Sequence, residues 1–283
     1  TNGTSIYAYG DSALNGAQIT NSQAIYGIGG SALSALVADS ALDIYGYGVS
    51  ALSSTTLAPF SGQIFAYGES ALSGAVLTNA IHIYAFGESS LTGATGDGMS
   101  DIYVFGRDTL NHAKLNNGSS LIYAIGNEAL STANLDGVTE LYAFGESALG
   151  GGPAITNSQS VYAVGSQALH GLVMDNSGEV YGVGNEVMSG AIVKNNSSEV
   201  YAFGHQAMNS AAIDFSSRAY AFGSSALSSS IITNGADDIY AIGNSAGSGQ
   251  TFDGLGHIFM LGSGATATNS NDFVVGNSTY NYF

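Results

Sequence analysis

The chain has 283 residues, of which 40 are glycine, 2 are proline and none is cysteine or tryptophan. Only 9% of the residues are charged while 45% are hydrophobic, and four basic residues against 21 acidic ones give a formal net charge of −17. So few lysines and arginines neither neutralise phosphates nor hold an anionic membrane surface, so we expect no nucleic-acid binding and no membrane insertion. The lack of cysteine excludes disulfides and thiolate metal sites, and 10% aromatic residues argue against disorder.

An internal repeat runs through the whole sequence. The phrase at Ile83–Gly87, Ile-Tyr-Ala-Phe-Gly, returns in variant form, and the glycine that ends it recurs every 19 or 20 residues. These anchor glycines are Gly10, Gly29, Gly48, Gly68, Gly87, Gly106, Gly126, Gly145, Gly165, Gly184, Gly204, Gly223, Gly243 and Gly262. A period of this length is typical of proteins that stack one supersecondary unit many times.

The residues before each anchor glycine form columns of constant character. The fourth residue before it is aliphatic, the second is mostly Ala or Gly, and the residue directly before it is large and apolar. The third residue before it is always aromatic, and this position holds 12 of the 17 tyrosines. We expect this aromatic ladder to mediate self-association; it consists of Tyr7, Tyr26, Tyr45, Phe65, Tyr84, Tyr103, Tyr123, Tyr142, Tyr162, Tyr181, Tyr201, Tyr220, Tyr240 and Phe259.

The columns favour short β-strands over helices. Four apolar residues that end in glycine are too few for a helix, and most repeats carry a second turn signal, such as Asn117-Gly118 or Asp136-Gly137. Stacked coils place equivalent residues about 4.8 Å apart in parallel sheets. The sequence therefore predicts an all-β protein: a single β-solenoid (parallel β-helix) of about 14 coils over residues 1–269, with an irregular last coil and tail over residues 270–283.

Both faces of each predicted strand are apolar. Alternate residues of a strand face opposite sides, so the aliphatic and small columns share one face, and the aromatic and pre-glycine columns share the other. An uncovered apolar stripe of this kind favours lateral association between copies of the chain. The alternative is a bulge at the glycine that turns both apolar columns inward and leaves only tyrosine partly outside.

The two ends of the sequence suggest polymerisation. The first full repeat begins by Ile6, which leaves few residues for a cap, and Gly276 follows Gly262 after only 14 residues. The uncharged tail is rich in rings, and its candidate polymerisation residues are Phe273, Tyr280, Tyr282 and Phe283. We expect head-to-tail stacking, the alternative being a boundary within a longer repeat protein.

No group of residues predicts catalysis. The five histidines occupy several columns without metal-ligand spacing, so we expect them at the surface; they are His82, His112, His170, His205 and His257. Every step of the repeat is 19 or 20 residues, which leaves no insertion to shape a cleft for paired carboxylates. We therefore expect no enzyme.

Stacking brings acidic residues of successive repeats together. Glu199, Arg218 and Asp238 follow one another in one column and predict an exposed ionic ladder. Glu69 and Glu88 share a column without a cation between them, so a bound Ca²⁺ is one possible relief of their repulsion. We otherwise expect no cofactor and solvated acidic faces.

The phrase Tyr142–Ala148, Tyr-Ala-Phe-Gly-Glu-Ser-Ala, resembles the head repeats of bacterial trimeric autotransporter adhesins, which stack small–apolar–Gly strings into a β-solenoid. The resemblance implies a bacterial cell-surface β-solenoid repeat protein. This chain departs from the family in its longer repeat and its tyrosine column, and it has no heptad stalk, so trimerisation and host adhesion do not carry over.

Two functions follow as expectations. The first is a non-enzymatic extracellular structural subunit of a self-assembling filament or surface fibre, with other copies of itself as partners. The second is an adhesin or phage-type fibre shaft that binds glycans or surfaces through the aromatic ladder.

Overall fold

The computed structural model describes residues 4–280 except for positions 13–17, 20–22, 32–34, 36, 39–42, 52–53, 55, 58–61, 72–75, 78–80, 91–92, 94, 97, 99, 110–111, 113, 116–119, 133, 138, 152–153, 157–158, 173–177, 195–198, 215–217 and 277. All regular structure in the described residues is β, which confirms the predicted all-β solenoid fold. The chain forms two compact units, Thr1–Ala143 (unit 1) and Phe144–Phe283 (unit 2).

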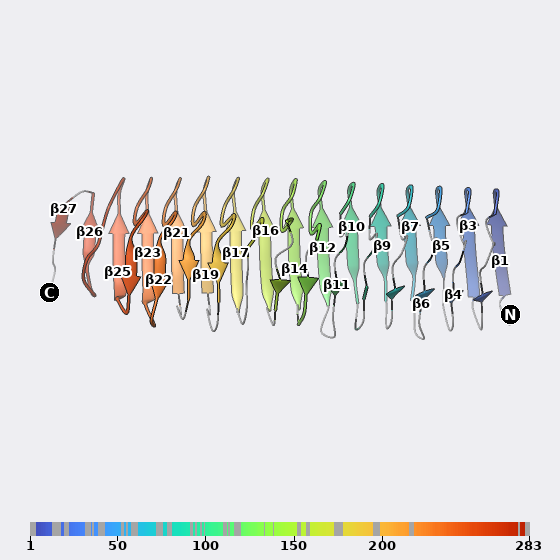
Figure 1. The fold of residues 1–283 in the computed structure, drawn as a ribbon, viewed down its shortest axis with the longest axis horizontal. Coiled ribbons are helices and arrows are strands. Elements are labelled where there is room, and N and C mark those ends of the chain that lie inside the picture. Colours follow the sequence, from blue (N-terminus) through green and yellow to red (C-terminus); the bar gives the residue numbers. More distant parts are fainter. Residues whose placement is uncertain are drawn as a thin grey trace. The chain divides into compact units, whose positions relative to one another are not determined.

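Unit 1 is built on a main sheet to which each repeat contributes one strand (Figure 1). Its strands, in chain order and in order across the sheet, are β1 (Thr4–Tyr9), β3 (Gln23–Ile28), β5 (Ile44–Tyr47), β7 (Ile64–Tyr67), β9 (Ile83–Phe86), β10 (Ile102–Phe105), β12 (Leu121–Ile125) and β14 (Glu140–Phe144). Two-residue strands lie between them along the chain: β2 (Gln18–Ile19), β4 (Val37–Ala38), β6 (Thr56–Leu57), β8 (Val76–Leu77), β11 (Lys114–Leu115) and β13 (Asn134–Leu135). Within the series β2, β4, β6 and β8, and between β11 and β13, each short strand pairs in parallel with its counterpart in the next repeat. A second line of pairing therefore supports these coils.

Unit 2 repeats this arrangement. Its main-sheet strands are β16 (Ser160–Val164), β17 (Glu179–Val183), β19 (Glu199–Phe203), β21 (Arg218–Phe222), β23 (Asp237–Ile242), β25 (Gly256–Leu261), β26 (Phe273–Val275) and β27 (Ser278–Tyr280). Its shorter strands are β15 (Ala154–Ile155), β18 (Ile192–Val193), β20 (Ala212–Ile213), β22 (Ile231–Thr233) and β24 (Thr251–Asp253). Pairing from β16 to β26 is parallel throughout, and only β27 runs antiparallel to its neighbour (Figure 1).

The strand register places equivalent residues of successive repeats side by side. Tyr7 lies opposite Tyr26 between β1 and β3, and Tyr181 lies opposite Tyr201 between β17 and β19. Because this register is kept along each unit, the columns of the sequence become straight ladders across the sheet.

The core lies on one face of the main sheet. The aliphatic column, which includes Ile25, Ile122 and Ile239, is fully buried wherever it is described from β3 onward, and so is most of the small column, which includes Ala143. The third and fourth residues after the anchor glycine, most often alanine and leucine, close the coil from the other side, as Ala226 and Leu227 do with no exposed surface. In two repeats a hydroxyl replaces that alanine, and the Ser90 hydroxyl donates to the carbonyl oxygen of Gly106 at 2.7 Å.

The anchor glycines occupy a backbone conformation that other residues rarely adopt. Gly165 has a φ of +133°, and a Cβ added there would lie 2.1 Å from the carbonyl oxygen of Gly184 in the next coil. Both the dihedral angle and the close approach require glycine, since a side chain would force the two coils apart. This explains why one glycine recurs in every repeat.

The turn after each anchor glycine alternates between positive and negative φ. Ser225, Leu227 and Ser229 have φ values of 55°, 51° and 55°, which are uncommon for residues with a Cβ. Their amide groups donate to carbonyl oxygens of neighbouring coils, for instance from Leu227 N to Ala246 O at 2.8 Å. Hydrogen bonding between coils therefore continues through the turns.

The last coil is shorter than the others but continues the sheet. β26 pairs in parallel with β25, and Asp272, which is nearly fully buried, accepts hydrogen bonds from the amides of Thr268 and Asn269 at 3.0 and 2.9 Å. The carboxylate satisfies the amides of the preceding turn and fixes the start of β26.

Candidate functional site: an outward apolar stripe

The outer face of the main sheet carries two adjacent columns of apolar side chains in each unit. The aromatic column is half-buried from Tyr26 to Phe259 and exposed at Tyr7, and the pre-glycine column is exposed or half-buried. We call the two columns together the apolar stripe. In unit 1 the pre-glycine column consists of Tyr9, Ile28, Tyr47, Tyr67, Phe86, Phe105 and Ile125; in unit 2 it consists of Phe144, Val164, Val183, Phe203, Phe222, Ile242, Leu261 and Val275.

This geometry decides between the two arrangements that the sequence allowed. The bulged alternative, with both apolar columns turned inward, is wrong, because strict alternation continues to the anchor glycine. In β12, for example, Ile122 is fully buried and Ile125 is 37% exposed. The stripe is therefore uncovered in the single chain.

The aromatic column forms a stacked ladder in each unit. In unit 1, from Tyr7 to Tyr142, successive ring centroids lie 4.7–5.1 Å apart with interplanar angles of 2–12°. In unit 2, from Tyr162 to Tyr240, the spacing is 4.5–5.1 Å. Because each ring lies against the next, the ring faces are covered and mainly the edges and hydroxyl groups point outward.

The ladder continues beyond Tyr240 with a change in geometry. Phe259 is tilted by 35° from Tyr240 at 5.9 Å, and Phe273 stacks on Phe259 at 5.2 Å. Of the four predicted polymerisation residues, Phe273 lies in β26 and is 38% exposed. Tyr280 lies in β27, which pairs along the edge of β26, and Tyr282 and Phe283 lie outside the described residues.

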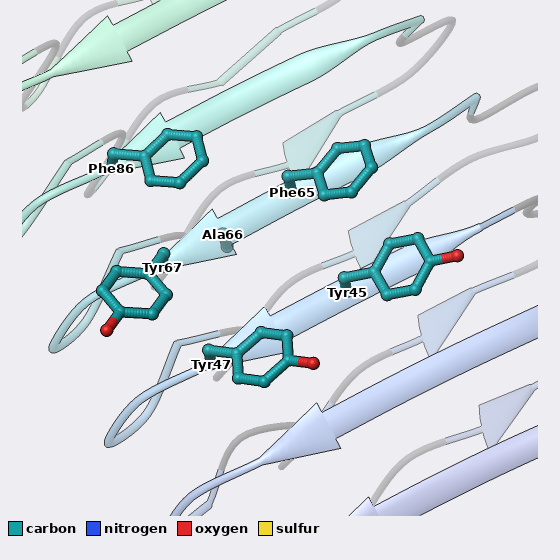
Figure 2. Close-up of a pocket in the computed structure, with 6 residues that line it drawn as sticks. All are labelled: Tyr45, Tyr47, Phe65, Ala66, Tyr67 and Phe86. Atoms are coloured by element: carbon teal, nitrogen blue, oxygen red, sulfur yellow. The ribbon is translucent and has the colours of Figure 1, made fainter.

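The pre-glycine column of unit 1 is interrupted at Tyr67. Phe86 and Phe105 stack at 5.0 Å and 1°, whereas Tyr67 lies 6.2 Å from Tyr47 and 6.1 Å from Phe86 with angles of 36° and 30°. Two open hollows of about 170 and 420 Å³ lie beside Tyr67, the smaller of them entirely among rings and Ala66 (Figure 2).

Carboxylates border the aromatic column on the side away from the anchor glycines. The Tyr201 hydroxyl donates to Glu179 at 2.8 Å, and the Tyr220 hydroxyl donates to Glu199 at 2.6 Å. Burial raises the pKa of both tyrosines far above the ordinary 10.0, and the carboxylate that accepts each hydrogen bond raises it further.

Three further tyrosines of the ladder show the same direction of shift. Burial raises the pKa of Tyr45, Tyr103 and Tyr142, and the nearby carboxylates of the same border raise it further. The environment therefore favours the neutral, hydrogen-bond-donating form of these five tyrosines.

Ion pairs complete this border. Arg218 binds Asp238 at 2.6 Å, His257 Nδ1 lies 3.0 Å from the same carboxylate, and His82 Nδ1 lies 2.9 Å from Asp101. The Arg218–Asp238 step of the predicted ionic ladder is confirmed, while Glu199 accepts a hydrogen bond from Tyr220. The stripe thus has an apolar centre and a polar border.

The described residues contain no metal-binding cluster, and their histidines lie at the surface. All five histidines lie at the surface as predicted, His170 being half-buried and the others exposed. Within the ranges that the structure describes, no group of three or more His, Asp or Glu side chains could hold a metal ion, so the predicted Ca²⁺ alternative gains no site there. No helix in that same part of the chain is long and apolar enough to cross a membrane.

Two features of the site were not predicted from the sequence. The sequence does contain a signal for the tyrosine–glutamate hydrogen bonds. Glu179 lies five residues before one anchor glycine, and its partner Tyr201 lies three residues before the next one; Glu199 and Tyr220 have the same spacing. The turned ring of Tyr67 has no sequence signal, since Tyr47 occupies the same column with the regular orientation.

Comparison with protein-family models, with curated proteins and with solved structures finds no match to this chain.

Proposed function

We propose that this chain is a non-enzymatic structural protein of the cell exterior, a subunit that packs laterally with copies of itself into a filament or surface fibre. The observation that carries the proposal is the uncovered apolar stripe of each unit. Parallel sheets with two apolar faces are typically covered on both of them, and the described residues leave the outer face open.

The exposed ring surface of unit 1 is large enough to form much of a protein–protein interface. In unit 1 the most exposed rings of the stripe are Tyr7 (59%), Tyr9 (78%), Tyr47 (39%), Tyr67 (60%) and Phe105 (38%). At about 150–250 Å² for each aromatic side chain, they leave roughly 400–700 Å² of ring surface open. A stable interface uses about 800 Å² of each partner, with an apolar centre and a polar rim.

The arrangement of the rings favours self-association over the alternative of a glycan-binding adhesin. Sugars bind aromatic side chains by lying on an exposed ring face, whereas the ladder rings are stacked 4.5–5.1 Å apart along Tyr162–Tyr240. The edges that remain suit interdigitation with other apolar side chains.

Sedimentation velocity over a concentration series, followed by negative-stain microscopy, tests the proposal. We expect the wild-type chain to associate as its concentration rises and to form uniform elongated assemblies. Replacing Phe222, 38% exposed on the stripe of unit 2, with Asp places a charge in the proposed interface and should weaken association.

Ser229→Asp is the matched control. Ser229 is exposed on a turn of the same unit, and its positive φ of 55° suits aspartate. This variant adds the same charge away from the stripe and should associate as the wild type does. A wild-type chain that stays monomeric at all concentrations would overturn the proposed function.

A further inference from the structure

Tyr67 points away from the direction that its neighbours share. In Figure 2 the rings of Tyr47 and Phe86, which precede and follow it in the column, point back along their strands, while the Tyr67 ring points toward the end of β7. At 60% exposed, it is far more open than Tyr47 at 39%. Tyr67 is therefore a projecting knob between its two neighbours in the column.

The reversal leaves a hollow beside the knob. The hollow of about 170 Å³ is lined by Tyr45, Tyr47, Phe65, Ala66, Tyr67 and Phe86 (Figure 2). It occupies the place that the Tyr67 ring would fill if it followed the column. Apolar cavities of about 150 Å³ bind a benzene ring, so this volume matches a single aromatic side chain.

We propose that the Tyr67 ring of a second copy of this chain fills this hollow, so that two copies pair about a two-fold axis with each Tyr67 seated in the other's hollow. In a two-fold interface the same surface patch serves both partners, and a knob adjacent to its own matching hole is self-complementary. This pairing would be the first contact of the lateral association proposed above, and the inference rests on that proposed function.

The surroundings of the hollow favour a second copy over another occupant. Its lining carries no charged side chain, and the knob and hollow lie within the roughly 400–700 Å² of open ring surface in unit 1. A lone small molecule would fill the hollow but leave the Tyr67 ring exposed, whereas a second copy covers both the hollow and that ring.

Three variants test the pairing by analytical ultracentrifugation. Tyr67→Ala removes the knob and should raise the dissociation constant at least about 30-fold, the effect of losing a central hot-spot ring. Tyr67→Phe keeps the ring and should stay within about threefold of the wild type. Tyr9→Ala is the matched control, because it removes a ring of the same column that is even more exposed, at 78%, and lies outside the hollow.

A fluorescent variant follows the ring directly. The chain has no tryptophan, so Tyr67→Trp supplies a single indole, whose emission should shift to shorter wavelength as association buries it. Circular dichroism of each variant at concentrations where it is monomeric confirms that the fold is kept.

The outcomes separate this inference from the proposed function. If the wild type associates and Tyr67→Ala weakens association no more than Tyr9→Ala, the stripe mediates association but the knob-and-hollow pairing is wrong. An indole emission of the Tyr67→Trp variant that does not change with concentration would also overturn the pairing. If the wild type never associates, the proposed function fails and the pairing with it.

Discussion

At the scale of single residues, the anchor glycine determines how closely two coils approach. Its amide donates to the residue before the preceding anchor glycine, as Gly48 N does to Ile28 O at 2.9 Å, and its missing side chain leaves room for the next carbonyl group. Fourteen repetitions of a single glycine therefore reflect one steric requirement rather than general flexibility.

Replacing Gly165 with Ala should destabilise the fold strongly. The new Cβ would lie 2.1 Å from the Gly184 carbonyl oxygen at a φ of +133°, so we expect the free energy of unfolding to fall by about 3 kcal/mol or more. Urea unfolding followed by circular dichroism measures this loss.

Gly171→Ala in the same repeat is the control for this prediction. Gly171 has a φ of +64°, and an added Cβ meets no atom within 4 Å, so the cost should be only about 1 kcal/mol. Equal costs at the two positions would show that backbone conformation alone, and not the approach of the next coil, selects the anchor glycine.

The buried tyrosines predict a loss of stability at alkaline pH. The folded-state pKa values of Tyr201 and Tyr220 lie above the ordinary 10.0. The stabilisation that the two protonated tyrosines contribute is therefore fully present below pH 10. As the pH rises through 10, tyrosines of the unfolded chain lose their protons first, and the free energy of unfolding falls. Urea unfolding across this range should show the decline, and it should be shallower in a variant with Phe at both positions. An unchanged slope in that variant would contradict the assignment.

The repeat pattern predicts the columns of the strands but not the backbone conformation of the turns. The recurrence of Gly, Tyr and aliphatic residues at fixed spacing predicts the strands and their register, because a shift of one residue would expose the whole core. It did not predict that Leu227 adopts a positive φ of 51°, since leucine rarely does so. Hydrogen bonds to the next coil, which depend on the completed stack, stabilise that conformation.

At the scale of elements, each main-sheet strand divides its residues between two tasks. In β12, Ile122 is fully buried in the coil and Ile125 is 37% exposed on the stripe. The strand therefore offers the same side chain on both faces, three residues apart. This allows folding and association to be separated experimentally.

We expect the two isoleucines of β12 to respond differently to truncation. Ile122→Ala should lower the free energy of unfolding by about 2–5 kcal/mol, because it leaves a cavity in the coil. Ile125→Ala should lower it by less than about 1 kcal/mol and weaken self-association instead. Urea unfolding and sedimentation velocity on both variants check the pair. A large stability loss for Ile125→Ala would mean that the stripe is covered within the single chain.

The sequence did not decide whether the pre-glycine column faces outward or inward. Alternation alone predicts that the aromatic and pre-glycine columns share a face, but a bulge before the glycine would have reversed the second of them. Only the described strands exclude that bulge. The orientation of single rings, such as Tyr67, depends on packing among neighbours that no column of the sequence specifies.

At the scale of the whole molecule, the stripe and the net charge act in opposite directions. The chain carries a formal charge of −17 with a pI of about 4.1, so two copies repel each other at neutral pH while their apolar surfaces attract. We expect this repulsion to keep the chain dispersed at low concentration. Association is therefore expected to depend on the ionic conditions.

Added salt should strengthen self-association. Raising the ionic strength from about 0.01 to about 0.15 M shortens the screening length from about 30 to about 8 Å, which weakens the repulsion but leaves apolar contacts intact. Sedimentation velocity at fixed protein concentration should show the assembled fraction rising with salt, and rising again as the pH approaches 4.1. Phe222→Asp, which places a charge on the stripe of unit 2, should stay less associated than the wild type under both conditions. If association instead weakened with salt, ion pairs between copies rather than the apolar stripe would hold the assembly together.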